Sequence, residues 1–220
     1  MRELGQDLTR EVYEDAGVVS EFAARPRAST ERLDAFARSL RGGRIIDIGC
    51  GPGHDAFHFA SLGRLVTAVD YSEAMIQVAR LRLVQVQIGG GDPPTFLVLD
   101  MRDIGGAFPA DSFDGAWVSA SLLHVPEPEV PVVLGGVRTI LAPGGKAHIS
   151  LKAGSQGAAL ISEHKYGRKI EREFVFWEEG SFEALLREAG FRRISCERRI
   201  GGTTGGQPTP WLWFTAEADK

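Results

Sequence analysis

The sequence predicts an α/β protein built around one mostly parallel sheet. Short apolar runs recur along residues 44–151, and amphipathic helical stretches separate them. Two of these runs end in an aspartate, Asp70 or Asp100, and a third is followed by Gly49, Gly51 and Gly53. Alternating strands and helices favour parallel pairing with right-handed crossovers, and such sheets bind ligands beyond the carboxyl ends of their strands.

The elements follow in order along the chain. Two helical stretches, 3–24 and 29–40, are separated at Arg25-Pro26, because a proline disfavours helix in the residue before it. Apolar runs predict five strands, at 44–48, 65–69, 96–99, 113–118 and 147–151. A less regular insert then covers 152–176, and a helix over 181–189 ends at Gly190, a typical C-cap residue. Two last strands are expected at 191–199 and 211–218, joined by a loop over 201–210.

The turn after the first strand has the form strand, glycine loop, helix. Glycines let a ligand approach the backbone, and the start of a helix adds free N–H groups with a partial positive charge. Such a turn binds a pyrophosphate or a nucleoside that carries a carboxylate. The dinucleotide pattern G-x-G-x-x-G would need a glycine at His54, whereas this chain has G-x-G-x-G with Asp47 inside the strand.

Five motifs occur together in a fixed order: Ile46-Asp47-Ile48-Gly49-Cys50-Gly51-Pro52-Gly53, Val69-Asp70-Tyr71-Ser72-Glu73-Ala74-Met75, Leu99-Asp100-Met101, Phe113-Asp114 and Leu141-Ala142-Pro143-Gly144-Gly145. In this set the chain resembles class I S-adenosylmethionine-dependent methyltransferases, and most closely the small-molecule group with quinone-biosynthesis and natural-product enzymes. The resemblance implies a Rossmann-like, doubly wound sheet of seven strands in the order 3-2-1-4-5-7-6. The last strand of this sheet would be antiparallel, and N-terminal helices would precede the sheet in the chain.

The resemblance also implies a cofactor, S-adenosyl-L-methionine, and residues that bind it. In such families Asp47 steadies the loop near the amino acid part of the cofactor, and Asp70 accepts hydrogen bonds from both ribose hydroxyls. Asp100 and Met101 meet the adenine edge, and Ser119 offers its backbone carbonyl to the methionyl amine. The full set of expected cofactor-binding residues is Tyr13, Asp47, Gly49, Cys50, Gly51, Gly53, Asp70, Tyr71, Met75, Asp100, Met101 and Ser119.

The acceptor side is expected to include His124, just beyond the fourth strand. An unperturbed histidine pKa near ~6.5 suits a general base at neutral pH, although a residue that only shapes the pocket fits the same position. Tyr166 and Arg168 lie in the insert that in relatives forms part of a substrate lid, and Arg168 suits recognition of a carboxylate or phosphate. A solvated loop is the alternative for this segment.

Composition fits a single domain of 220 residues. The expected parts are an N-terminal helical cap (1–40), a cofactor-binding core (44–151), a lid or insert (152–177), and a C-terminal helix with a strand hairpin (178–220). A net charge of −4 gives no general attraction to nucleic acid or anionic membranes. No apolar run reaches the ~20 residues of a membrane span, no signal-peptide core is present, and no metal-ligand spacing occurs. A cytoplasmic enzyme with a small-molecule acceptor is therefore expected.

The sequence leaves four functions open. Methyl transfer to oxygen is the first interpretation, and transfer to nitrogen or carbon of a small molecule is the second. An NAD-dependent oxidoreductase would explain Gly49, Gly51 and Asp70, but it leaves Asp47 and the Asp100-Met101 pair unexplained. A non-catalytic scaffold that keeps the cofactor site is the fourth interpretation.

Overall fold

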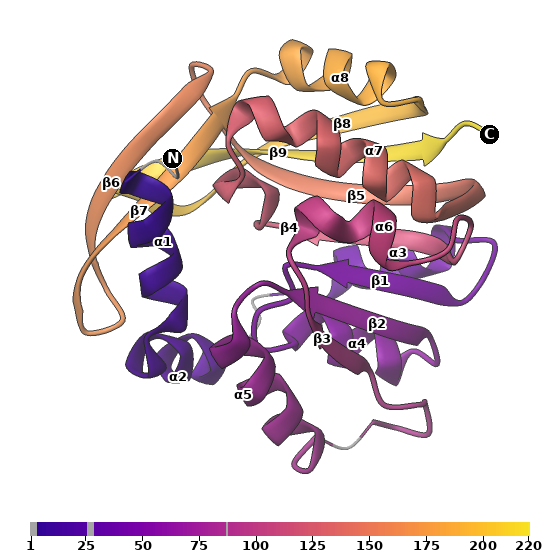
Figure 1. The fold of residues 1–220 in the computed structure, drawn as a ribbon, viewed down its shortest axis with the longest axis horizontal. Helices are drawn as coiled ribbons and strands as arrows, with labels where there is room; N and C mark the ends of the chain where they lie inside the picture. The colour runs from indigo at the N-terminus through magenta and orange to yellow at the C-terminus, as the bar shows by residue number, and fades with distance from the viewer. Residues whose placement is uncertain (1–3, 26–28, 87) are drawn as a thin grey trace.

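The computed structural model describes residues 4–25, 29–86 and 88–220, which form one sheet covered by helices on both faces (Figure 1). In the described residues the strands are β1 (Arg44–Ile48), β2 (Leu65–Asp70), β3 (Thr95–Val98), β4 (Phe113–Ser119), β5 (Leu141–Ala153), β6 (Gly157–Lys165), β7 (Arg168–Trp177), β8 (Phe191–Thr204) and β9 (Gln207–Ala218). The α-helices are α1 (Leu4–Glu14), α2 (Ala16–Ala24), α3 (Glu31–Ser39), α4 (His54–Ser61), α5 (Glu73–Leu83), α6 (Ile104–Ala107), α7 (Val130–Ile140) and α8 (Glu179–Glu188).

The sheet confirms the predicted α/β class and strand order. Strands β3, β2, β1, β4 and β5 lie side by side in parallel, and β9 pairs antiparallel with both β5 and β8. This is the predicted order once β8 and β9 are counted as the sixth and seventh strands. The described residues contain nine strands rather than seven, because the expected irregular insert forms the antiparallel pair β6–β7, which joins the end of β5.

Successive side chains on the strands fill two separate hydrophobic cores. Ile45 on β1 packs with α3, α4 and α5, whereas its neighbour Ile46 packs with α6, α7 and α8. Side chains alternate between the two faces of a strand, and the central strands are apolar on both faces, so they read as continuous apolar runs. Figure 1 shows α6, α7 and α8 on the near face.

The N-terminal segment differs from the single predicted helix over 3–24. It forms two helices that meet at Asp15, whose carboxylate accepts a hydrogen bond of 2.9 Å from the Val18 N–H and so caps α2. The predicted loop at 201–210 is shorter than expected, because β8 and β9 extend to a tight turn at Gly205-Gly206.

Helix α1 is fastened to two separate parts of the fold. The Glu173 N–H on β7 donates to Thr9 Oγ1 at 2.7 Å, and the Ser72 hydroxyl before α5 donates to the Tyr13 carbonyl at 2.8 Å. The Glu14 carboxylate accepts from the first N–H groups of α5. The helix therefore spans from the β6–β7 hairpin to the end of β2.

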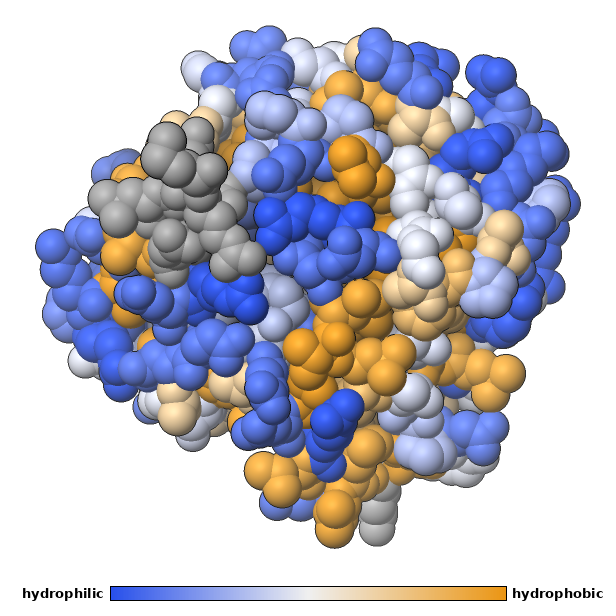
Figure 2. Space-filling view, viewed as in Figure 1, coloured by the Kyte–Doolittle hydropathy of each residue, from blue (hydrophilic) through white to orange (hydrophobic). Residues whose placement is uncertain are grey.

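Figure 2 shows apolar residues gathered toward the lower edge of the same face. Leu81 and Val84 at the end of α5 and Val98 on the edge strand β3 are exposed. Among the described residues, no helix is both long enough and apolar enough to span a bilayer.

Candidate functional site

The glycine loop between β1 and α4 is tied to the end of β2. The N–H groups of Gly49 and Cys50 both donate to the Val69 carbonyl, at 2.8 and 3.0 Å. Gly49 has a φ of 74°, and a Cβ added there would lie 2.2 Å from the Ser121 Cβ. Glycine at position 49 is therefore required both by backbone conformation and by space.

Asp70, at the end of the neighbouring strand β2, binds the glycine loop through its carboxylate. One carboxylate oxygen accepts from the Gly51 N–H at 2.8 Å and the other from the Ser72 N–H at 2.9 Å. Burial raises the pKa of Asp70 to about 6, although these hydrogen bonds favour its charged form. Each oxygen can accept a further hydrogen bond, and Asp70 lines the cavity described below, which suits the two hydroxyls of a ribose.

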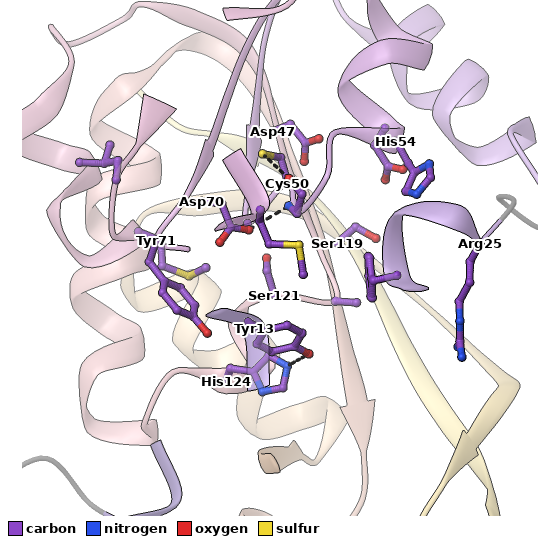
Figure 3. A pocket seen from close by; sticks show the side chains of 18 residues that line it. Tyr13, Arg25, Asp47, Cys50, His54, Asp70, Tyr71, Ser119, Ser121 and His124 are labelled. Carbon is purple, nitrogen blue, oxygen red and sulfur yellow. Dashed lines mark hydrogen bonds between the residues drawn. The ribbon is translucent and has the colours of Figure 1, made fainter. Parts of the chain in front are cut away.

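A cavity of about 300 Å³ opens beside this loop, at the carboxyl ends of β1, β2 and β4 (Figure 3). Eleven of the predicted site residues line it: Tyr13, Asp47, Gly49, Cys50, Gly51, Asp70, Tyr71, Met75, Met101, Ser119 and His124. In Figure 3, Tyr71 stands at one end of the cavity and His54 and Arg25 at the other, with Tyr13 and His124 facing each other below. Residues from three of the five sequence motifs therefore line one cavity, together with Tyr13, Ser119 and His124.

Four predicted site residues lie outside its wall. Gly53 caps α4 with a φ of 81°. Asp100 lines a smaller adjoining cavity and accepts from the Arg102 guanidinium at 2.6 and 2.9 Å. Burial opposes ionisation of Asp100, but the hydrogen bonds from Arg102 outweigh it and hold the carboxyl pKa below its usual range.

The two insert residues are also placed elsewhere. Tyr166 is buried at the turn between β6 and β7, with its ring 6.0 Å from that of Phe22 and the Arg25 guanidinium 4.5 Å above its centre. Arg168 is half exposed and forms an ion pair of 2.8 Å with Asp15. Tyr166 therefore supports the cavity wall from behind, and Arg168 fastens the hairpin to the start of α2.

His124 is held at both ring nitrogens. Its Nδ1 lies 2.8 Å from the Glu173 carbonyl, which can only accept, so Nδ1 carries the proton. Its Nε2 accepts from the Tyr13 hydroxyl at 3.0 Å, and that hydroxyl oxygen accepts from Arg172 at 2.8 Å. Burial, with the nearby Arg172 and Lys152 charges, lowers the pKa of His124 to about 3. These contacts favour the pocket-shaping role over the general-base role.

Several wall residues carried no signal in the sequence. Phe22 and Arg25 reach the cavity only because α2 folds over it, and Ser121 does so because its hydroxyl donates to the Ile48 carbonyl at 2.7 Å. Asp55 in the first turn of α4 accepts from the Trp117 indole at 2.7 Å. Asp55 is the exception among these residues, because its place directly after the glycine loop could have indicated a site residue. An acid in the first turn of a helix interacts favourably with the helix start.

Comparison with known proteins agrees with this geometry. Residues 45–145 match the family described as methyltransferase domain. This central part of the chain is therefore similar to a methyltransferase domain. The match covers the glycine loop and the strands that border the cavity, and it agrees with the resemblance seen in the sequence motifs.

Relatives extend the similarity beyond this domain. The chain is 34% identical over 121 residues to a ubiquinone biosynthesis O-methyltransferase of Xanthomonas axonopodis pv. citri, covering 54% of this chain and 48% of that protein. It is 31% identical over 145 residues to the protein of the same name from Chromobacterium violaceum, covering 65% and 60%. The chain thus spans about half the length of the first of these relatives.

Solved structures agree on the fold of the methyltransferase domain. The 1,6-didemethyltoxoflavin-N1-methyltransferase of Burkholderia thailandensis, solved with 1,6-didemethyltoxoflavin and S-adenosylhomocysteine, superposes with a TM-score of 0.69 at 23% identity, over 98% of this chain and 87% of that one.

Proposed function

We propose that the protein transfers a methyl group from S-adenosyl-L-methionine to an oxygen of a small-molecule acceptor. The observation that carries this proposal is the cavity formed by the glycine loop and two buried aspartates, Asp47 and Asp70. The names of the O-methyltransferase relatives support it. A buried carboxylate is costly unless it is well supplied with donors, and at Asp70 a ligand with two adjacent hydroxyls would add to the two N–H groups that already bind it.

The cavity residues fit the parts of this cofactor in order. Asp70 would accept both ribose hydroxyls, and Tyr71, Met75 and Met101 would border the adenine. The backbone carbonyl of Ser119 would accept from the methionyl amine, near Asp47. At the far end, Arg25 would pair with the methionyl carboxylate.

We assign most of the rate acceleration to alignment. When bound, the cofactor supplies a methyl group on a positively charged sulfur, and that charge disappears in the transition state. The protein then needs to hold the acceptor in line with the methyl group and exclude water. The neutral His124, bonded to Tyr13, would fix the shape of the acceptor side.

Binding measurements test the cofactor assignment. Titration calorimetry and thermal shift with S-adenosylmethionine, S-adenosylhomocysteine, NAD and NADP should show binding only to the first two, with stabilisation of ~2.7 kcal/mol at a hundredfold excess over Kd. Asp70→Ala should weaken that binding at least ~tenfold, since it removes two charge-assisted hydrogen bonds. The control is Asp114→Ala, because Asp114 pairs with Arg44 outside the cavity. Binding of NAD alone would refute the proposal.

Turnover separates an enzyme from a scaffold. Release of S-adenosylhomocysteine should be followed over a panel of phenols, carboxylates and amines. Cofactor binding without consumption of any acceptor from a broad metabolite pool would favour the non-catalytic interpretation.

A further inference from the structure

Two buried cations lie behind the acceptor side of the cavity. Lys152 on β5 and Arg172 on β7 are each 5% exposed. Both contact the Phe174 ring, with Lys152 Nζ at 4.5 Å and Arg172 Cζ at 5.0 Å from its centre, and that ring lies 4.9 Å from the His124 ring. Phe174 therefore lies between the two charges and His124 of the cavity wall, and Arg172 also donates directly to the Tyr13 hydroxyl on that wall.

The positive charge in this region exceeds the negative charge beside it. Glu163 on β6 forms an ion pair with Arg172, and the partly buried Lys165 lies on the same face of the hairpin. The Glu173 side chain belongs to the opposite face, because residue 173 pairs with the half-exposed Leu160. The ionisable groups that surround His124 and Phe174 are Tyr13, Lys152, Glu163, Lys165, Tyr166 and Arg172. Arg25 beside Tyr166 and Asp70 on the far side of Tyr13 also act on this group. With these two included, four cations stand against two carboxylates, so positive charge remains in excess.

This side of the site also has little capacity to accept a proton. His124 already uses Nε2 to accept from Tyr13, and the same cations oppose its protonation. The carboxylates of the cavity wall, Asp47, Asp55 and Asp70, all lie on the loop side with β1, α4 and β2. Burial and the neighbouring Arg172 lower the pKa of Lys152 to about 8, as expected where positive charge is in excess.

We propose that the acceptor atom is an oxygen that binds already ionised, as a carboxylate or an acidic phenol or enol, and that Lys152 and Arg172 determine this specificity through the positive field they create. The inference rests on the proposed methyl transfer. In that step the oxygen anion forms a bond to the methyl carbon, the sulfur–carbon bond breaks, and its electron pair stays on sulfur as a neutral thioether. The proton has left the acceptor for solvent before binding. Ammonium acceptors are disfavoured by the same field.

A chromophoric probe reports ionisation without turnover. With S-adenosylhomocysteine in place, 4-nitrophenol should bind as the coloured phenolate, with an apparent pKa about one unit or more below its value in water, a tenfold preference for the anion. The isosteric 4-nitroaniline, which carries no charge, should bind more weakly. Lys152→Met should return the pKa of the bound probe toward its water value, whereas Lys152→Arg should retain the shift.

A matched control lies on the same strand. Lys146, also on β5, donates to the Ser39 carbonyl far from the cavity, so Lys146→Met should leave the pKa of the probe unchanged. In turnover, rates across a series of phenols should follow the ionised fraction of each acceptor, and Lys152→Met should lower kcat/KM for anionic acceptors roughly tenfold.

The outcomes separate the two proposals. If S-adenosylmethionine does not bind, the proposed function fails. If the cofactor product binds, the inference alone is overturned by any of three results: no bound nitrophenolate, equal use of amines and acidic phenols, or an unchanged probe pKa in Lys152→Met.

Discussion

The pKa of Asp70 predicts that cofactor affinity depends on pH. The ribose hydroxyls need lone pairs on an ionised carboxylate, and in the free protein burial raises the pKa of Asp70 to about 6. At pH 5 about nine-tenths of the molecules would carry a protonated Asp70, so Kd should be about tenfold weaker than at pH 8. Titration calorimetry with S-adenosylhomocysteine across this range measures the effect directly.

The Asp70→Asn variant provides the control. Its amide does not titrate, so its affinity should be weak at all pH values and should lack the wild-type change near pH 6. A wild-type Kd that is the same at pH 5 and pH 8 would refute the assignment of Asp70 to the ribose.

The raised pKa of Asp70 also makes the stability of the cofactor-free protein depend on pH. The direction is opposite to that of an ion-paired carboxylate, whose pKa is lowered by folding. The folded state raises the pKa of Asp70 from 3.8 to about 6, so folding favours the protonated form. Stability is therefore lost as pH rises through the interval from about 4 to about 6, by about 3 kcal/mol in total. Urea unfolding of the wild type and Asp70→Asn at several pH values isolates this contribution, because all other titrating groups are shared. A difference between the two that does not vary with pH would contradict it.

Three further substitutions test the construction of the site. Gly49→Ala should abolish cofactor binding, because its Cβ would overlap a neighbouring side chain at 2.2 Å, whereas Gly63→Ala, at a similar φ of 75° but in open space, should cost only ~1–2 kcal/mol in thermal unfolding. Trp117→Phe removes the indole N–H that donates to the buried carboxylate of Asp55, while an aromatic ring still fills most of the space. The free energy of unfolding, measured with urea, should fall by ~1–3 kcal/mol. His124→Gln should keep cofactor affinity and raise the acceptor KM, while kcat changes less than ~tenfold; a fall in kcat of ~10²–10⁴-fold would instead establish a general base.

The parallel core and most of the cavity could be predicted because they depend on local sequence. An apolar strand followed by glycines, or ending in an aspartate, produces nearly the same backbone wherever it occurs, and parallel strands bring their carboxyl ends to one edge. Asp47, Asp70 and Ser119 therefore line the same cavity, as the resemblance to the family implied.

The hairpin and the contacts of α1 were not predictable in the same way. Gly157–Lys165 alternates small, apolar and charged residues in a pattern that also fits a loop, and its pairing with β7 depends on β5 ending beside it. Arg168 was expected at the acceptor, yet Asp15 lies within reach of it at the start of α2. Arg172, four residues later on the same strand, is buried instead, because Glu163 and Tyr13 both pair with it. Such choices depend on contacts between distant segments, which single-sequence patterns do not encode.

The position of α1 has a consequence for cofactor exchange in the proposed reaction. Because the helix brings Tyr13 to the cavity wall and is fastened at both the hairpin and α5, we expect release of a spent cofactor to be coupled to the opening of these attachments. Local opening of this kind is far cheaper than global unfolding, and it limits turnover in many enzymes. Amide hydrogen exchange in α1 should therefore slow when the cofactor product binds.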